Sequence, residues 1–530
     1  AAVRELSSMV WAYIKDIESV YGQTPLRYTS QQQMMYRVWK KRDVYSPEEL
    51  SLIRQKSKEP KGPLQATLKQ ELPAVPDKVY VPKASTIELD DIIRSSIAGP
   101  RMEAQVGYYR GDFTLVDARS MYAYLMLSQS FPIGEEIVVM NPQEAIQYMA
   151  HPDYIGIYLV MHNQSSMKGR FPLAYHRVAL YNPDGSIREY TTDLNKIPNE
   201  FITEYLPDVT IKGLQAAGAD IQLASKEGQP YAIVWRRSAP GQVFKNTLSI
   251  PLQHKLFWDT LKSSHDPRYD PRVHASRKNE MNGLSGKMVQ KRSTFHWKLW
   301  NMKHKELADY LSTLGESSLK PLIYTVAENV VFTVHPKDRQ SQYRGAPPSQ
   351  LGVFIYAYGR DWMWQNILSK MHVYYVNTDG AVIDSSNLHL LQGVIGPNPG
   401  QLKVEAQFDE IFVARKSLFQ GRMKGEVVKT SMSGISQSDL FDGRSIHGNE
   451  KLFFDLLYNN KRVVVTSRHL QNNMREGQLL DKVYDKTIIW GAEDEVKSRP
   501  SLFDLPSEPV PDGLILFSSD DSTLDEDPVI

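Results

Sequence analysis

The sequence predicts an α+β fold, because helical patterns and strand patterns occupy separate stretches of its 530 residues. Apolar residues recur at helical spacing in residues 3–21, and residues 245–262 and 272–292 form two further helical segments. Strand and turn patterns dominate residues 150–240 and 371–384. An apolar fraction of 41% is enough for a globular core, and this length allows several subdomains.

The composition excludes several kinds of chemistry. There are no cysteines, so disulfides, thiolate zinc sites and cysteine catalysis are excluded. With 62 basic and 61 acidic residues the net charge is +1, lower than in many DNA-binding proteins but compatible with a local basic cleft. There is no apolar run of membrane-spanning length and no signal-peptide pattern, so we expect a protein that is not secreted and has no membrane partner. The chain begins at Ala1 without a Met, so we expect the numbering to start inside a longer or processed product.

The two ends of the chain differ from the middle. The first hundred residues contain two helical patterns, the second at 86–97, separated by the proline-rich residues 58–86, which are typical of a linker or an extended crossing. The last 35 residues combine prolines with a run of acidic residues, which predicts a flexible acidic tail.

The first candidate functional residue is Asp117. Residues 113–117 form a strand pattern that ends at this aspartate, and a helical pattern begins near Ser120. A carboxylate at the end of a buried strand is well placed to bind a metal ion. It can equally cap the following helix, and taken alone the capping interpretation is the simpler one.

The second candidate lies on the helical segment 272–292. Lys278, Asn282, Ser285 and Gly286 are spaced by three and four residues, so they share one face of the helix. A lysine and an asparagine on one face can contact phosphate and ribose or base, and Gly283 and Gly286 would allow a base pair or backbone to approach closely. The alternative is a solvated basic helix.

The third candidate is Asp379, which we expect at the exposed tip of a β-hairpin spanning residues 371–384. Asp-Gly is a favoured tight-turn pair, so the alternative is that Asp379 serves the turn alone. Basic residues follow on short strands, among them Lys416 and Lys429, as a nucleic-acid backbone would require, although a solvated sheet face explains them as well. We expect residues 450–480 to be helical with basic patches.

In this order the segments resemble the motifs of family B DNA polymerases, in the protein-primed branch found in bacteriophages, adenoviruses and fungal linear plasmids. Asp117-Ala-Arg-Ser120-Met-Tyr122 resembles the Asp-x-x-Ser-Leu-Tyr motif, Lys278 to Gly286 resembles Lys-x-x-x-Asn-Ser-x-Tyr-Gly, and Tyr375-Val-Asn-Thr-Asp379-Gly resembles Tyr-x-Asp-Thr-Asp-Ser. Lys416-Ser-Leu418 resembles Lys-x-Tyr, Lys429 to Gly434 resembles the Lys-Gly element at the thumb boundary, and Tyr109-Arg-Gly111-Asp resembles the Tyr-x-Gly-Gly linker. The resemblance covers residues 105–435.

The resemblance implies a right-hand polymerase fold with palm, fingers and thumb. The implied divisions are an N-terminal, mainly helical region with a proline-rich linker (1–104), palm (105–242) with an inserted segment at about 160–225, fingers (243–292), palm (293–435) with a second insertion at about 300–350, thumb (436–495) and the acidic tail (496–530). In this branch the first insertion contacts the priming protein and the second is linked to strand displacement.

The resemblance also implies a function, template-directed DNA polymerisation by two-metal nucleotidyl transfer, and a role for each site residue. Asp117 and Asp379 would be the catalytic residues and hold two Mg²⁺ (or Mn²⁺) ions. The residues that would bind the incoming deoxynucleoside triphosphate are Lys278, Asn282, Tyr122, Ser120 and Ser285; those that would contact primer or DNA are Lys416, Lys429, Tyr109 and Thr378. The implied partners are a DNA template and primer, nucleotides and a terminal priming protein, in a virus-infected host cell or, for a linear-plasmid origin, a mitochondrion.

Four residues depart from the family motifs: Asn377, Ser285, Leu418 and Gly380. In addition, no Asp-x-Glu exonuclease signature precedes Asp117, so we expect no proofreading domain in this chain. Three functions therefore stay open at this point. They are an active polymerase without proofreading, a polymerase-fold protein that binds nucleic acid or supports an assembly without catalysis, and a two-metal nuclease that uses the same aspartates.

Overall fold

The computed structural model describes residues 14–15, 17–18, 20–21, 31–46, 49, 78–167, 178–181, 187–191, 201–290, 292, 295–300, 322–327, 330–336, 339–436, 439–473 and 478–491. Most of the helical pattern 3–21, most of the proline-rich segment 58–86 and the acidic tail lie outside these residues. None of the helices described has the length and apolar character needed to cross a membrane.

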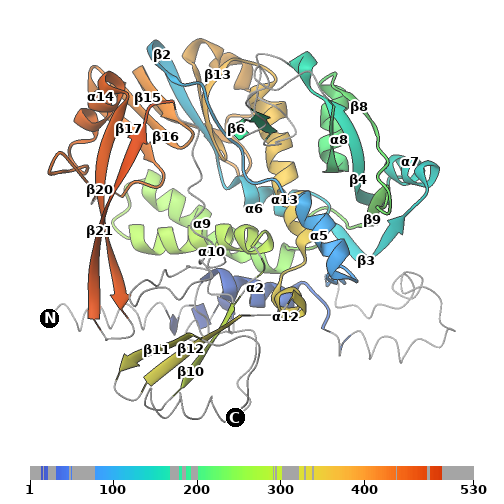
Figure 1. Cartoon of the computed structure of the whole chain (residues 1–530). Coiled ribbons are helices and arrows are strands. Elements are labelled where there is room, and N and C mark those ends of the chain that lie inside the picture. Colours follow the sequence, from blue (N-terminus) through green and yellow to red (C-terminus); the bar gives the residue numbers. More distant parts are fainter. Residues whose placement is uncertain are drawn as a thin grey trace.

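A seven-stranded antiparallel sheet lies at the centre of the chain, in the order β1-β13-β14-β2-β15-β16-β17 (Figure 1). Its strands are β1 (Met102–Ala104), β2 (Gly107–Ala118), β13 (Val373–Asn377), β14 (Gly380–Asp384), β15 (Leu402–Arg415), β16 (Leu418–Met423) and β17 (Glu426–Met432). Strand β2 alternates between two cores: Val116 belongs to the main core with residues of α6 (Met121–Ser128) and α13 (Ser349–Met363), whereas Phe113 and Leu115 belong to an aromatic cluster on the other face. Burial on both faces fixes the register of this strand.

Two long antiparallel helices follow, α9 (Lys245–Ser263) and α10 (Pro271–Met288), close to the predicted bounds. Asp270 caps α10 by accepting a hydrogen bond from the backbone of Arg272, and Pro271 occupies the first helical position, where its missing N–H costs nothing. The inner face of α10 packs against α2 (Gln31–Arg42), which lies beneath the hairpin in Figure 1. The helical prediction for both segments is confirmed.

A second sheet has the order β3-β9-β4-β7, with β8 also pairing with β4. The elements of this part are β3 (Pro132–Val139), α7 (Pro142–Ala150), β4 (Tyr154–Asn163), β7 (Ile202–Pro207), α8 (Asp208–Ala216), β8 (Asp220–Leu223) and β9 (Ala232–Arg237), with the separate hairpin β5 (Val178–Tyr181) and β6 (Ile187–Thr191). The strand-rich prediction for residues 150–240 is confirmed. Strands β7 and β8 of the expected first insertion pair with β4, which begins before it.

A third, three-stranded sheet overlaps the expected second insertion, in the order β10-β12-β11. Its elements are β10 (Phe295–Trp300), β11 (Leu322–Ala327) and β12 (Val330–Pro336), followed by α12 (Arg339–Gly345). Short irregular helices also occur at Ser165–Met167, Trp364–Leu368 and Ser385–Leu391.

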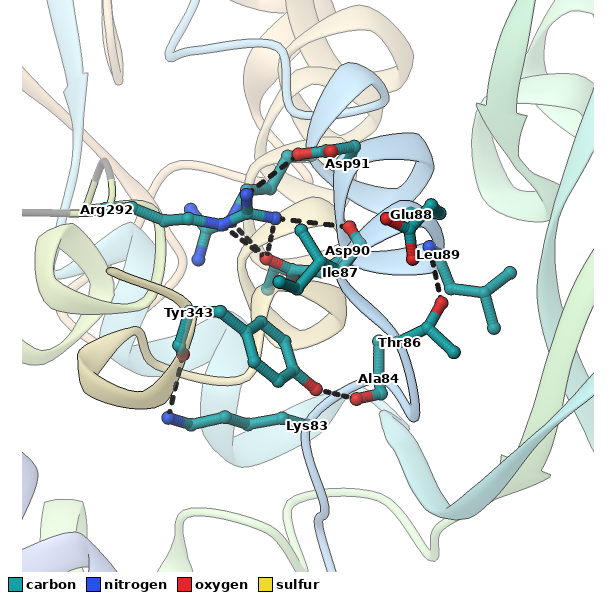
Figure 2. A network of polar contacts seen from close by, with 12 residues as sticks. Lys83, Ala84, Thr86, Ile87, Glu88, Leu89, Asp90, Asp91, Arg292 and Tyr343 are labelled. Carbon is teal, nitrogen blue, oxygen red and sulfur yellow. Dashed lines mark hydrogen bonds and ion pairs between the residues drawn. The ribbon is translucent and has the colours of Figure 1, made fainter. Parts of the chain in front are cut away.

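Helix α5 (Ile87–Ser95) lies within the helical pattern predicted at 86–97, and the hydroxyl of Thr86 caps it. This helix contacts the chain at both ends of the third sheet (Figure 2). Its buried Asp90 accepts hydrogen bonds from Arg292, just before β10, and from Ser349 at the start of α13. Burial disfavours the charge of Asp90, but Arg94, Ser349 and Arg292 outweigh burial and hold the pKa of Asp90 below its usual value.

The chain that leaves the third sheet contacts the same region. Arg339 pairs with Asp91 at 2.5 Å, and the Tyr343 hydroxyl donates a hydrogen bond to the carbonyl of Ala84. Lys83 in turn donates to the carbonyl of Tyr343 at 3.3 Å (Figure 2). The two chain crossings at the base of the third sheet are therefore tied to residues 83–91.

The C-terminal part corrects one prediction. Helix α14 (Glu450–Asn460) forms as expected, but β20 (Arg462–Asn473) and β21 (Gln478–Ile489) form a long hairpin in a sheet with β18 (Leu440–Phe441) and β19 (Arg444–Ser445). The helix ends at Lys461, which has a left-handed conformation with φ of 59°. The β-branched run at 463–466 then favours a strand, so the expectation of a helix across residues 450–480 was wrong beyond Asn460.

Candidate functional site

Asp117 and Asp379 come together at one end of the central sheet. Asp117 lies near the end of β2, directly opposite Gly380 of β14, and the backbone N–H of Ala118 donates to the carbonyl of Asp379 at 2.8 Å. A Cβ at position 380 would lie 3.4 Å from Oδ1 of Asp117, an ordinary van der Waals contact, so position 380 lies directly beside that carboxylate. Asp379 is half-buried rather than at an exposed tip, because its hairpin lies inside the sheet, flanked by β1 and β2.

The two carboxylates influence each other. Burial, followed by the charge of Asp117, raises the pKa of Asp379 to about 7, while Lys278 and Lys403 act in the opposite direction. Burial also raises the pKa of Asp117, mainly against the charge of Lys403. Two adjacent carboxylates with raised pKa values gain from any cation placed between them.

Lys403 is a site residue that the sequence did not reveal. It stands opposite Asp117 in the β15–β2 register, and its ammonium nitrogen lies 3.0 Å from Oδ2 of Asp117 and 3.3 Å from Oε2 of Glu405. Lys429 pairs with the other oxygen of Glu405 at 2.5 Å. Lys403-Val-Glu405 is a common strand pattern, so only the pairing register could have identified this lysine.

The aspartate pair suits a hard divalent cation. Among the described residues, no group of three or more histidine, aspartate or glutamate side chains could hold a metal ion. Mg²⁺ nevertheless binds proteins through one or two carboxylates, with waters and substrate phosphates as its other ligands. Asp117 and Asp379 fit that pattern, and the ammonium group of Lys403 beside Asp117 shows that this position accepts a positive charge.

Helix α10 presents a separate face to this pair. Lys278 and Asn282 are exposed, and with Gly286 they form a stripe at intervals of four residues. The positive charge of Lys278 opposes the effect of burial and acts to lower the pKa of both aspartates. This side chain therefore lies within electrostatic reach of them. Ser285 leaves the predicted common face: it is 3% exposed and its hydroxyl donates to the carbonyl of Asn282 at 2.8 Å.

The two glycines of this helix differ. A Cβ at Gly283 would lie 2.9 Å from Cγ of Gln32, so the close approach at this position is that of α2. A Cβ at Gly286 would meet nothing within 4 Å, so the exposed stripe is open there. Of the two glycines, Gly286 is the one that leaves space for a ligand.

Tyr122, on α6, lies within electrostatic reach of Asp379. Burial, then Tyr356 and Asp379, raise the pKa of Tyr122 well above its usual value. Its ring centroid is 5.1 Å from that of Tyr356, and a Cβ at Gly359 would lie 2.9 Å from Cε1 of Tyr122. The ring therefore sits against α13 where Gly359 makes room. Ser120, with φ of 50°, precedes α6, and its buried hydroxyl has no hydrogen-bond partner in the part of the chain described.

The residues expected to contact DNA lie on the same central sheet. Lys416 is 3.8 Å from Glu103, and the N–H of Thr378 donates to the carbonyl of Arg101 at 2.6 Å. The Tyr109 ring packs on Tyr374 at 4.8 Å between centroids. The structure thus brings Asp117, Asp379, Lys278 and Tyr122 together, and places Lys416, Lys429, Tyr109 and Thr378 on the surrounding strands and turns.

The burial of Leu418 accounts for the absence of the motif's tyrosine at this position. Leu418 is fully buried in the cluster that joins β15 and β16 to α14, so a tyrosine would have to replace a core side chain there. Asn377 ends β13 and its amide donates a long hydrogen bond, 3.4 Å, to the Tyr375 hydroxyl.

Residues 39–204 match a family model described as DNA polymerase type B, organellar and viral. This match agrees with the resemblance stated from the motifs over residues 39–204, a range that includes Asp117 and Tyr122. Two structures similar to the chain are Phi29 DNA polymerase in an orthorhombic crystal form (15% identity, TM-score 0.47, covering 78% of this chain and 64% of that one) and Phi29 DNA polymerase complexed with primer-template DNA (14% identity, TM-score 0.49, covering 86% and 67%). The chain thus spans about 64% of the first of these polymerases. No match was found among curated proteins.

Proposed function

Because residues 39–204 match the family model of organellar and viral type B DNA polymerases, we propose that this protein extends a DNA primer by template-directed nucleotidyl transfer. The observation that carries the proposal is the convergence of Asp117, Asp379 and Lys278. These residues come from a sheet strand, a hairpin turn and a helix far apart in sequence, and the charge of Lys278 acts on both carboxylates. Such a set can neutralise and orient a triphosphate.

Each residue has a proposed role. Asp117 and Asp379 would hold the divalent ions, which supply charge neutralisation for the primer hydroxyl and the leaving pyrophosphate when bound. Lys278 would contact the triphosphate, and Asn282 and Ser120 would line the nucleotide pocket, whereas the burial of Ser285 removes it from the predicted nucleotide-binding set. Tyr122 would exclude a ribose 2′-hydroxyl.

The remaining proposed contacts concern nucleic acid. Lys416, Lys429, Tyr109 and Thr378 surround the aspartates on the sheet and would contact primer or template. Backbone contacts of this kind are electrostatic and weaken steeply with salt. Protein priming is a further part of the proposal.

The test is primer extension on a DNA template with Mg²⁺ and deoxynucleotides. We expect Asp117→Ala and Asp379→Ala each to abolish extension. Asp384→Ala is the matched control: it removes a carboxylate at the other end of β14, bonded to the Tyr374 hydroxyl, and should retain extension. Normal extension by either site variant would contradict the metal-binding assignment.

A second function is favoured by one observation. The ammonium group of Lys403 pairs with Oδ2 of Asp117, and Asn377 is found where the family motif has an aspartate. The site therefore carries less negative charge than the motif implies. A protein that binds nucleic acid without catalysis would keep this arrangement. Asn377→Asp separates the two functions, because added charge should raise activity or alter metal preference in a polymerase and leave a binding protein inactive.

The nuclease alternative gains no support from the structure. A two-metal nuclease would bring further carboxylates or histidines to the pair, and no such metal-binding group exists among the described residues. A nuclease would also leave the lysine of α10 without a role. Dependence of the reaction on nucleoside triphosphates distinguishes the two activities.

A further inference from the structure

The buried face of α10 is held by polar contacts from the N-terminal region. The Tyr21 hydroxyl donates to Oε2 of Glu280 at 2.7 Å, across 259 residues of sequence. Glu280 is fully buried and also accepts hydrogen bonds from Arg277 at 3.1 Å. Tyr21 therefore adds a hydrogen bond to the buried ion pair of Arg277 and Glu280, two residues that lie on either side of Lys278 in the sequence.

Helix α2 extends these contacts along α10. Gln31 donates to the Ser276 hydroxyl at 2.9 Å, Gln32 packs against Gly283, and Lys287 lies 5.8 Å above the ring of Tyr36. Figure 1 shows α2 running beneath the helical hairpin. The contact thus covers three successive parts of α10 rather than one point.

The end of α2 is joined to the start of α9 as well. The indole N–H of Trp39 donates to the carbonyl of Val243 at 2.8 Å. Asp43, which is fully buried, accepts from the backbone of Asn246 at 2.8 Å and from the hydroxyl of Thr247. Both helices of the hairpin are therefore fastened to one N-terminal element.

We propose that this N-terminal element, Tyr21 with residues 31–43, positions α10 so that Lys278 and Asn282 face the incoming nucleotide. Each helical residue is rotated by about 100° from the one before, so fixing the buried face of α10 also fixes the direction of its exposed stripe. The proposal rests on the proposed nucleotide-binding role of that stripe. Tyr21, Gln32 and Gly283 are positioning residues, since they act through the helix.

Directional contacts are what distinguish this arrangement from simple packing. Apolar surfaces would hold α10 against α2 but would allow it to rotate or slide by small amounts, because apolar attraction has no preferred direction. A buried hydrogen bond to Glu280 and a side chain fitted into the space left by Gly283 each define one rotation and one register. Loss of either contact should therefore affect nucleotide binding before it affects the fold.

Two variants test the proposal, with one control and one rescue. Tyr21→Phe removes only the hydroxyl, and Gly283→Ala introduces a methyl group against Gln32. Tyr148→Phe is the control, because the ring of this tyrosine of α7 packs on Tyr154 of β4. The rescue is Gly283→Ala combined with Gln32→Ala, which removes the contacted Cγ.

Three measurements are made on each protein: KM and kcat for deoxynucleotide in primer extension, equilibrium affinity for a fluorescent deoxynucleoside triphosphate, and hydrogen exchange of residues 271–288. For both single variants we expect KM to rise and affinity to fall by about fivefold, the equivalent of one lost hydrogen bond, with kcat little changed. We expect faster exchange in α10. The double variant should recover, and Tyr148→Phe should match the wild-type protein.

Contrary results have separate meanings. Unchanged KM and affinity in both single variants would overturn the positioning role, even if the melting temperature fell. A wild-type protein that binds the nucleotide but does not extend a primer would contradict the proposed function alone, and affinity and exchange would then decide the positioning role. A wild-type protein that binds no nucleotide would overturn both.

Discussion

The ammonium group of Lys403 lies 3.0 Å from the carboxylate of Asp117, across two paired strands of the central sheet. The lysine side chain is about one-third exposed and also contacts Glu405. Burial disfavours its charge, but the two carboxylates outweigh burial and raise the pKa of Lys403, so it stays protonated at neutral pH. The ammonium group of Lys403 would therefore compete with a metal ion for the carboxylate of Asp117.

Replacing Lys403 should strengthen metal binding. In Lys403→Gln a competing charge is removed from Asp117, and we expect the affinity for Mg²⁺ to rise by about fivefold, as for a partly exposed ion pair. Calorimetric titration of Mg²⁺ into the protein measures this directly. Lys429→Gln, which loses only the outer contact with Glu405, should change the affinity less. Equal affinities in wild type and Lys403→Gln would mean that the ammonium group does not compete.

The contacts of Tyr122 predict that substitutions at Tyr122 and at Gly359 change the discrimination between ribonucleotides and deoxynucleotides. Tyr122→Ala should admit ribonucleotides, raising the ratio of ribonucleotide to deoxynucleotide incorporation by about tenfold or more. Gly359→Ala should change the same ratio, because its methyl group would lie 2.9 Å from the tyrosine ring and displace it. Tyr356→Phe keeps the neighbouring ring and should be neutral. Single-nucleotide incorporation with each sugar measures the ratio, and an unchanged ratio in Tyr122→Ala would refute the role.

Asp90 should contribute more to stability than its neighbour Asp91. Asp90→Ala leaves Arg292 and Arg94 without their buried carboxylate, and we expect it to lower the free energy of unfolding by about 3 kcal/mol. Asp91→Ala removes a half-exposed carboxylate that pairs with Arg292 and Arg339, and should cost about 1 kcal/mol or less. Denaturant titration compares the two variants. Equal losses would show that burial of Asp90 adds nothing to the ion pair.

Asp43 should make stability depend on pH. Burial raises the pKa of Asp43 to about 7, against the hydrogen bonds from Thr247 and Asn246. Between about pH 4 and pH 7 the folded protein then binds a proton that the unfolded chain has lost, so this residue lowers stability as pH rises through that range. Asp43→Asn should therefore gain stability relative to wild type from pH 4 to pH 7, with a constant difference above. Melting temperatures at a series of pH values test this, and a constant difference from pH 4 upward would contradict the raised pKa.

The sequence predicted what local pattern controls. The helical hairpin, the β-hairpin at Asp379 and the helix after Thr86 follow from residue spacing and turn residues, and all three form. The position of Lys403 depends instead on how β15 aligns with β2, which is set by packing on both faces of the sheet. The expectation of a helix across residues 450–480 missed the strands after Asn460, where the β-branched run at 463–466 favours a strand.

The site residues divide in the same way. Asp117, Asp379 and Lys278 could be named because each stands in a motif, whereas the burial of Ser285 depends on how α10 is rotated by its contact with α2. The sequence predicted that a base pair or a backbone approaches closely at Gly283, and only the tertiary structure identifies α2, through Gln32, as the element that does so. Such details depend on tertiary contacts between segments about 250 residues apart in sequence, as between Gln32 and Gly283.

The attachment of Arg292 and Arg339 to one helix has a consequence for how this chain can vary. The segment between them enters and leaves the body of the protein at adjacent, fixed points on α5. The entropy of closing that segment is largely set by its anchored ends, and doubling its length would add only about 0.6 kcal/mol. We therefore expect changes in the length of this segment to cost the fold little and to leave the central sheet and its aspartates in place.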